Sequence, residues 1–150
     1  MPRSSIPRVK AALVAAVDVA LPDDVLVTWG NPRGSKPREW VMVGNVRGLQ
    51  RAAAQGRQRR KEHYVIEVQV TVTAADTADP QEIADRAFDI AAEIEELLRA
   101  DESLGDVEGL ITAEVVKTDL TEGMLAVSAG QTSGERMAEV MVHVACETRI

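Results

Sequence analysis

The chain has few of the residues that build disulfide frameworks, thiolate metal sites and aromatic clusters. Its 150 residues include one cysteine, Cys146, and only 3% are aromatic. A single cysteine excludes a disulfide within the chain and a zinc site built on several cysteines. No apolar run approaches the ~18 residues of a membrane span, so we expect no membrane partner. The first residues, Met-Pro-Arg-Ser-Ser, lack the apolar core of a signal peptide, so we expect none.

The length and composition predict a single domain spanning residues 1–150. Apolar residues make up 45% of the chain and charged residues 27%, and both fractions are ordinary for a globular protein. A chain of this length buries roughly 68–70% of its unfolded surface, which is enough for a self-sufficient core. Composition therefore defines a class of protein but says nothing about an activity.

Charge is divided unevenly along the chain. Residues 33–61 carry nine basic side chains against one acid, whereas residues 62–150 carry twenty acids against five bases, and the net charge is −7. A strongly basic segment in an acidic chain usually meets something negative, either nucleic acid or an acidic protein surface.

Hydrophobic periodicity predicts two helices and five strands. Each helix has a candidate capping residue before it and a proline near its first turn, and the strands alternate apolar with polar residues or are rich in valine. The expected helices are 6–20 and 80–99, and the expected strands are 25–29, 39–46, 64–73, 110–118 and 137–148. The order α-β-β-β-α-β-β predicts an α+β two-layer sandwich, with two helices packed on one face of a mostly antiparallel sheet.

Two segments show no such pattern. Residues 47–61 have one large apolar side chain, Leu49, so we predict a flexible basic loop there. It could be a solvated insertion, contact phosphates, or bind an acidic protein surface. Residues 119–135 could either extend the last two strands as a hairpin arm or remain loose. The basic side chains expected to face a subunit, another partner or DNA are Arg47, Arg51, Arg57, Arg59, Arg60 and Lys61.

The second predicted helix carries an acidic stripe. Its members recur at three- or four-residue spacing and therefore line one face: Glu82, Asp85, Asp89, Glu93 and Glu96. The stripe could simply keep the surface soluble, or the basic loop of a neighbouring subunit could neutralise it. A chain with one arginine-rich projection and one acidic stripe can associate head to tail, and such contacts can close into a ring.

Patterns that carry catalysis or metal binding are weak. The segment 30–36 superficially resembles a phosphate-binding loop, but its spacing is wrong and Pro37 follows it instead of a helix. His63 and His143 fall on separate strands and match no metal motif. Trp29 and Trp40 flank the same loop and fit packing at a hairpin end, although one of them could contact a partner. We therefore expect no enzyme activity, no cofactor and no metal.

Several stretches together resemble a known family. The segments 38–46, 59–70, 84–87 and 93–105, with the terminal Arg149-Ile150, are similar to the tail terminator (tail completion) proteins of long-tailed bacteriophages, particularly phages of high-GC actinobacterial hosts. The resemblance extends over most of the chain. It rests on the general residue pattern and on the order of the elements, and it includes no catalytic motif.

The resemblance implies a structural virion protein. Such a protein forms a ring, typically a hexamer, that caps the completed tail tube and then gives the head connector its docking surface in head–tail joining. The implied partners are other copies of the chain, the tail tube protein and the head connector or neck protein, and DNA could pass through the lumen. The implied location is the head-proximal end of the virion tail, after assembly in the host cytoplasm. The alternatives are a head–tail connector or neck protein, or a nucleic-acid-binding module that uses the arginine-rich loop.

Overall fold

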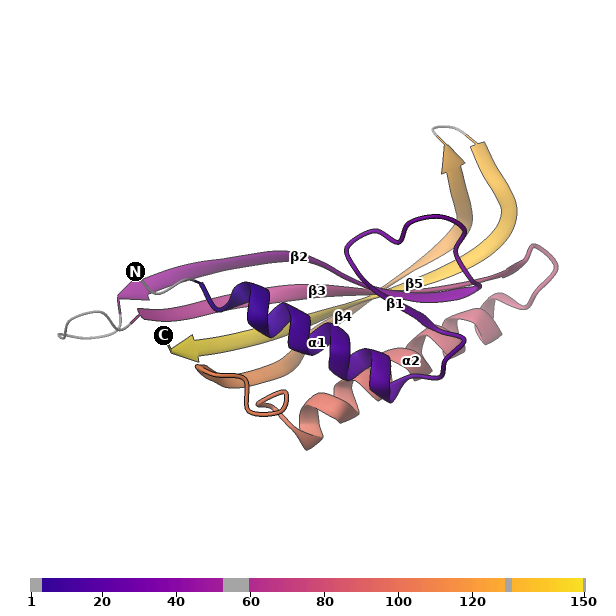
Figure 1. Ribbon diagram of the computed structural model, residues 1–150. Coiled ribbons are helices and arrows are strands. Elements are labelled where there is room, and N and C mark those ends of the chain that lie inside the picture. Colours follow the sequence, from indigo (N-terminus) through magenta and orange to yellow (C-terminus); the bar gives the residue numbers. More distant parts are fainter. Residues whose placement is uncertain (1–3, 53–59, 129–130, 150) are drawn as a thin grey trace.

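The computed structural model describes residues 4–52, 60–128 and 131–149. It contains two helices and five strands in the predicted order, so the α+β class is confirmed (Figure 1). The helix bounds agree with the periodicity to within one residue. The elements are α1 Ile6–Ala20, β1 Leu26–Trp29, β2 Glu39–Ala52, β3 Arg60–Ala75, α2 Pro80–Ala100, β4 Leu110–Ser128 and β5 Gln131–Arg149.

The strands form one mixed sheet in the order β1-β2-β3-β5-β4. β1 pairs in parallel with β2, and every other neighbouring pair is antiparallel. Loop 30–38 must return the chain from the end of β1 to the start of β2, because parallel neighbours need a crossover. Trp40 is buried next to this loop, with Lys36 Nζ 5.3 Å from its ring centroid. β1 and β4 are left as the two outer strands.

One face of the sheet supplies the core. Alternate residues of β3 and β5 are buried together with the apolar stripes of both helices in a single cluster that includes Val9, Leu13, Val68, Ile90 and Val142. Figure 1 draws both helices on the same side of the sheet. The period-two pattern of β3 therefore reflects burial of one face of the strand in this core, as the alternation predicted.

The N-terminal end of α1 is fixed by a buried polar junction. The Glu62 carboxylate, on β3 and 1% exposed, accepts hydrogen bonds from Ser4 Oγ at 2.7 Å and from the backbone N–H of Ser5 at 2.9 Å. Ser5 Oγ lies 3.2 Å from the Tyr64 hydroxyl and 2.9 Å from Thr148 Oγ1 on β5. A carboxylate at a helix N-terminus satisfies N–H groups that have no partner within the helix. The junction therefore ties α1 to two central strands.

The strands extend well beyond their predicted ends. The prediction of a flexible loop over residues 47–61 is wrong at both ends of that segment. β2 continues to Ala52 and β3 begins at Arg60. Arg47 pairs with Val65, and Ala52 pairs with Arg60. Backbone ladder bonds need no apolar side chains, so a polar sequence can still pair once a neighbouring strand is in place. Residues 53–59 lie outside the described part of the chain.

The last two strands form a long hairpin. β4 and β5 pair over most of their length, so the hairpin-arm alternative for residues 119–135 holds for the residues described. Pairing between β3 and β5 ends at Ala75 opposite Glu135, and beyond that point β4 and β5 continue as a two-stranded ribbon. Figure 1 shows the ribbon bending away from the side that the helices cover.

Candidate interaction surfaces

The predicted basic residues lie at one end of the sheet, and two of them are close to acids. Arg47 Nε lies 3.7 Å from Glu67 Oε1, and Lys61 Nζ lies 3.4 Å from Glu147 Oε1. Arg51 and Arg60 belong to the paired ends of β2 and β3, whereas Arg57 and Arg59 fall outside the described residues. The acids of neighbouring strands therefore offset part of the positive charge at this end.

An open pocket of about 490 Å³ lies beside these strand ends. Its lining includes Arg47, His63, Glu114 and Glu147, together with apolar and backbone atoms of β3 and β5. A guanidinium and an imidazole set among two carboxylates suit a polar protein segment, which carries donors and acceptors of both signs. They suit an unbroken row of phosphates poorly, because each carboxylate repels phosphate.

The acidic stripe of α2 faces away from the core. All of its members are exposed, which confirms that they share one outward face: Glu82, Asp85, Asp89, Glu93 and Glu96. Glu96 pairs with Arg99 at 2.8 Å, and within the described ranges the other four form no ion pair. No ion pair among the described residues joins this stripe to the basic strand ends, so its neutralisation by a second copy stays a prediction.

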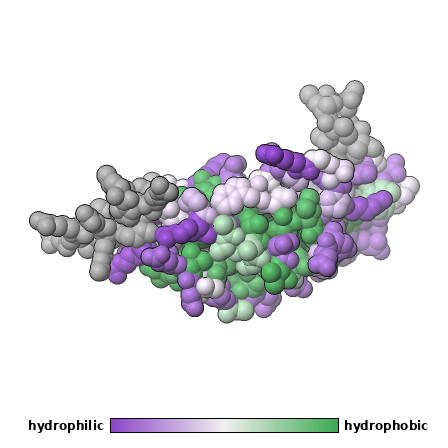
Figure 2. All heavy atoms as spheres, in the orientation of Figure 1, coloured by the Kyte–Doolittle hydropathy of each residue, from purple (hydrophilic) through white to green (hydrophobic). Residues whose placement is uncertain are grey.

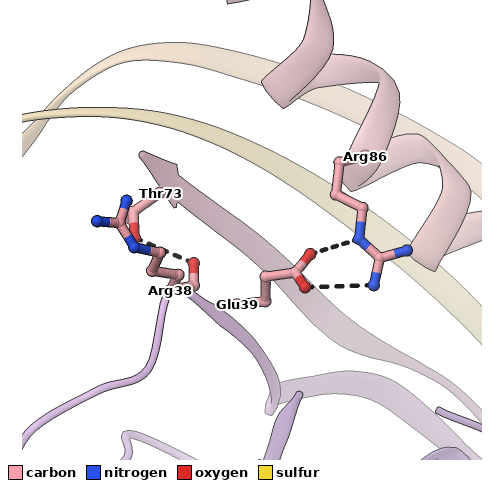
Figure 3. Close-up of polar contacts among 4 residues, drawn as sticks. All are labelled: Arg38, Glu39, Thr73 and Arg86. Carbon is pink, nitrogen blue, oxygen red and sulfur yellow. Dashed lines mark hydrogen bonds and ion pairs between the residues drawn. The ribbon is translucent and has the colours of Figure 1, made fainter. Parts of the chain in front are cut away.

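A guanidinium–carboxylate pair fixes the other flank of α2. Arg86 binds both oxygens of Glu39 at the start of β2, and the NH2–Oε1 distance is 3.2 Å (Figure 3). This contact raises the pKa of Arg86 above its already high ordinary value, chiefly through the hydrogen bond to Glu39. Beside it, the backbone N–H and Oγ1 of Thr73 both donate to the Arg38 carbonyl. The pair therefore links α2, which packs on β3, β4 and β5, to the start of β2.

The two tryptophans have different environments. Trp40 is 6% exposed, whereas Trp29 at the end of β1 is 51% exposed. Lys10 of α1 is mostly buried, and its Nζ lies 4.5 Å from the centroid of the Trp29 ring, a cation–π contact. Burial lowers the pKa of Lys10. No spacing pattern in the sequence signals this contact, because the two residues lie on different elements.

β4 exposes large apolar side chains along the opposite edge of the sheet. Val116 is 55% exposed, Ile111 46% and Leu120 41%, and Phe88 of α2 is 42% exposed. Pro80 and Ile83 line a pocket with Glu122, and Glu95 and Leu98 line another with Val115. Along α2, Phe88 lies between the residues that line these two pockets, and it is on the same face of the helix as Glu95, two turns away. We infer that Phe88 lies alongside the middle of β4.

The remaining candidate residues offer little chemistry. His143 Nε2 lies 3.1 Å from Asp119 Oδ2, and Cys146 is buried, with burial raising its pKa to about 12. Across 4–52, 60–128 and 131–149, no group of three or more metal-ligating side chains comes together. In the same ranges, no helix is both long enough and apolar enough to cross a membrane.

No protein-family model matches the chain, and no curated protein matches it. The surfaces described above are therefore interpreted from their own geometry and chemistry.

Proposed function

We propose that this chain is a tail terminator of a long-tailed bacteriophage: a structural protein that forms a ring of six copies on the end of the completed tail tube and offers the head connector its docking surface. The sequence resemblance suggests this role. The structural feature that best supports it is the placement of two hairpins at opposite ends of one helix-covered sheet.

The β4–β5 ribbon is the clearer of these two ends. Between Glu135 and the tip of the ribbon, β4 and β5 have only each other as neighbours. The β4 sequence 124–127, Met-Leu-Ala-Val, is apolar. A two-stranded ribbon alone is only marginally stable in water. A ribbon of this kind is suited to lie against another protein.

The basic hairpin is the other end. β5 runs from the ribbon at Gln131 to Arg149, which pairs with Lys61 beside the basic strand ends, so the two hairpins leave the sheet in opposite directions. A protein that sits between a tube and a connector needs a binding surface at each end. This arrangement supplies two surfaces that differ in chemistry.

The nucleic-acid-binding alternative has less support. Arg47 and Lys61 lie near Glu67 and Glu147, and the chain has a net charge of −7, so much of its surface repels phosphate. A dedicated module would bind isolated DNA tightly, with an affinity that falls steeply as salt rises. We expect only weak DNA binding by the isolated chain.

Co-sedimentation with tail tubes and with connectors tests the proposal. The wild type should bind both, and failure to bind either one would refute the terminator role. Binding to connectors alone would instead indicate a neck protein. One variant should replace residues 125–135 with an Asn-Gly turn, since Met124 pairs with Arg136. A second should replace residues 53–59 with a Gly-Ser linker. Each variant should stay folded and lose one of the two partners.

A further inference from the structure

Most of the exposed large apolar side chains lie at the two outer edges of the sheet. Among the described residues there are six: Trp29 on β1, three on β4 and Phe88 beside β4 lie at these edges, and Val19 lies on α1. Figure 2 adds that hydrophobic residues cover the middle of the helix side, with hydrophilic ones toward the ends of the sheet. Isolated exposed apolar residues are ordinary, but a group of them along one edge is typical of a contact surface.

We propose that these two edges bind each other in successive copies of the chain, which rests on the proposed function and adds to it the surfaces that join the subunits. The Trp29 edge consists of Lys10, Trp29 and loop 30–38. The Leu120 edge consists of Phe88, Glu114, Val116, Asp119 and Leu120. Each copy presents one edge on either side, so the contact is heterologous and can close into a ring.

Trp29 is suited to act as the anchor of this contact. Its ring is half exposed, yet Lys10 of α1 holds it from one side at 4.5 Å. A tryptophan that is already held in place loses little conformational freedom on binding, and tryptophan is enriched among the residues that dominate interface energies. The exposed apolar side chains of Phe88, Val116 and Leu120 offer a surface of matching chemistry.

Charge identifies the partner as a second copy of the chain. Loop 30–38 carries the exposed bases Arg33, Lys36 and Arg38 and no acid. At the Leu120 edge, residues 114–122 of β4 carry the exposed acids Glu114, Asp119 and Glu122. The one base over this stretch, Lys117, pairs with Asp119 at 3.2 Å, so the stretch keeps a net negative charge. Edges of opposite sign attract each other, whereas two copies of the same edge repel, so the charges favour head-to-tail association.

The contact is made by side chains rather than by joining the sheets. The pairing of β4 with β5 shifts register between Val115 and Lys117, which leaves Val116 outside the ladder. A bulge and a lysine on an outer strand both hinder the addition of another strand there. The bulge instead turns an apolar side chain outward at the centre of the Leu120 edge.

Two variants block one edge each. Trp29→Glu places a carboxylate against the acidic Leu120 edge of the next copy, and Lys10 offers it a partner within its own chain. Leu120→Arg places a charge in the opposite edge. Each variant should remain folded by circular dichroism and should lower the association constant at least tenfold. The matched control is Val19→Glu, at an apolar residue 87% exposed on α1, which should assemble as the wild type does.

Light scattering of the variants and of their mixture tests the proposal. Each variant alone should stay a monomer, whereas an equimolar mixture should form dimers of about 32 kDa, twice the 16.2 kDa chain, because each variant keeps one intact edge. If the wild type assembles only on tubes, the copies retained per tube are compared instead. Normal assembly by either variant, loss of assembly in the Val19→Glu control, or failure of the mixture to pair would overturn the edge assignment. A wild type that assembles neither alone nor on tubes would refute the proposed function itself.

Discussion

Replacing Glu62 with alanine should destabilise the fold more than most single substitutions. The carboxylate is 1% exposed and accepts two hydrogen bonds, from Ser4 Oγ and from the Ser5 N–H. A hydrogen bond to a charged group contributes about 1.5–3 kcal/mol, so the loss of both costs about 3–6 kcal/mol. Domains of this size are stable by only about 5–15 kcal/mol, so the variant would lose a large share of its stability.

The conservative variant Glu62→Gln separates charge from volume. The amide keeps one acceptor oxygen but turns its NH2 group toward the second donor, so about half of the alanine effect should remain, about 1.5–3 kcal/mol. Chemical denaturation followed by far-ultraviolet circular dichroism measures both changes. The control is Glu108→Gln. The Glu108 carboxylate is 89% exposed and pairs with Arg8, so the loss of this pair should leave the denaturation midpoint unchanged.

A free energy of unfolding for Glu62→Ala within about 1 kcal/mol of the wild type would contradict this prediction, since that loss is below the smallest one expected. That outcome would mean that solvent replaces the carboxylate at the start of α1 at little cost. A loss confined to α1 would also show in hydrogen exchange, since amides of the first turn would exchange faster while those of β3 and β5 stayed protected.

Three further substitutions or reagents probe the rest of the fold. Gly48→Val should cost about 2 kcal/mol or more in thermal unfolding, because a Cβ there would lie 2.3–2.6 Å from atoms of β3, whereas Gly123→Ala meets nothing within 4 Å and should be tolerated. Arg86→Met should cost about 1 kcal/mol by breaking a partly exposed pair with Glu39, and denaturation should show a smaller loss at high salt. Cys146 should resist a thiol reagent at pH 8 until the protein is unfolded, because it is buried and its pKa is raised to about 12; prompt labelling of the native protein would contradict this.

Local patterns predicted the secondary structure well. The helix bounds and the alternation of β3 follow from burial of one face, and Asp79 caps α2 by accepting from the Gln81 N–H. Hydrophobic spacing records which residues face a core, so it locates elements that pack on one. It does not record how far a strand continues past the core, which is why β2 and β4 extend beyond their predicted ends.

The contacts that hold the candidate surfaces were beyond the reach of sequence patterns. Glu62 lies 57 residues from Ser5, and Arg86 lies 47 residues from Glu39. Such pairs depend on how the elements cross in space, which neither spacing nor composition records. The acidic stripe on α2 could be predicted, because its members repeat along one helix.

Electron microscopy of tail tubes mixed with the purified chain tests the central claim most directly. The proposed function predicts one added ring at a single end of each tube, with the density of about six chains, and none along the tube wall. Chains bound along the wall, or tube ends that remain bare at saturating protein, would contradict it.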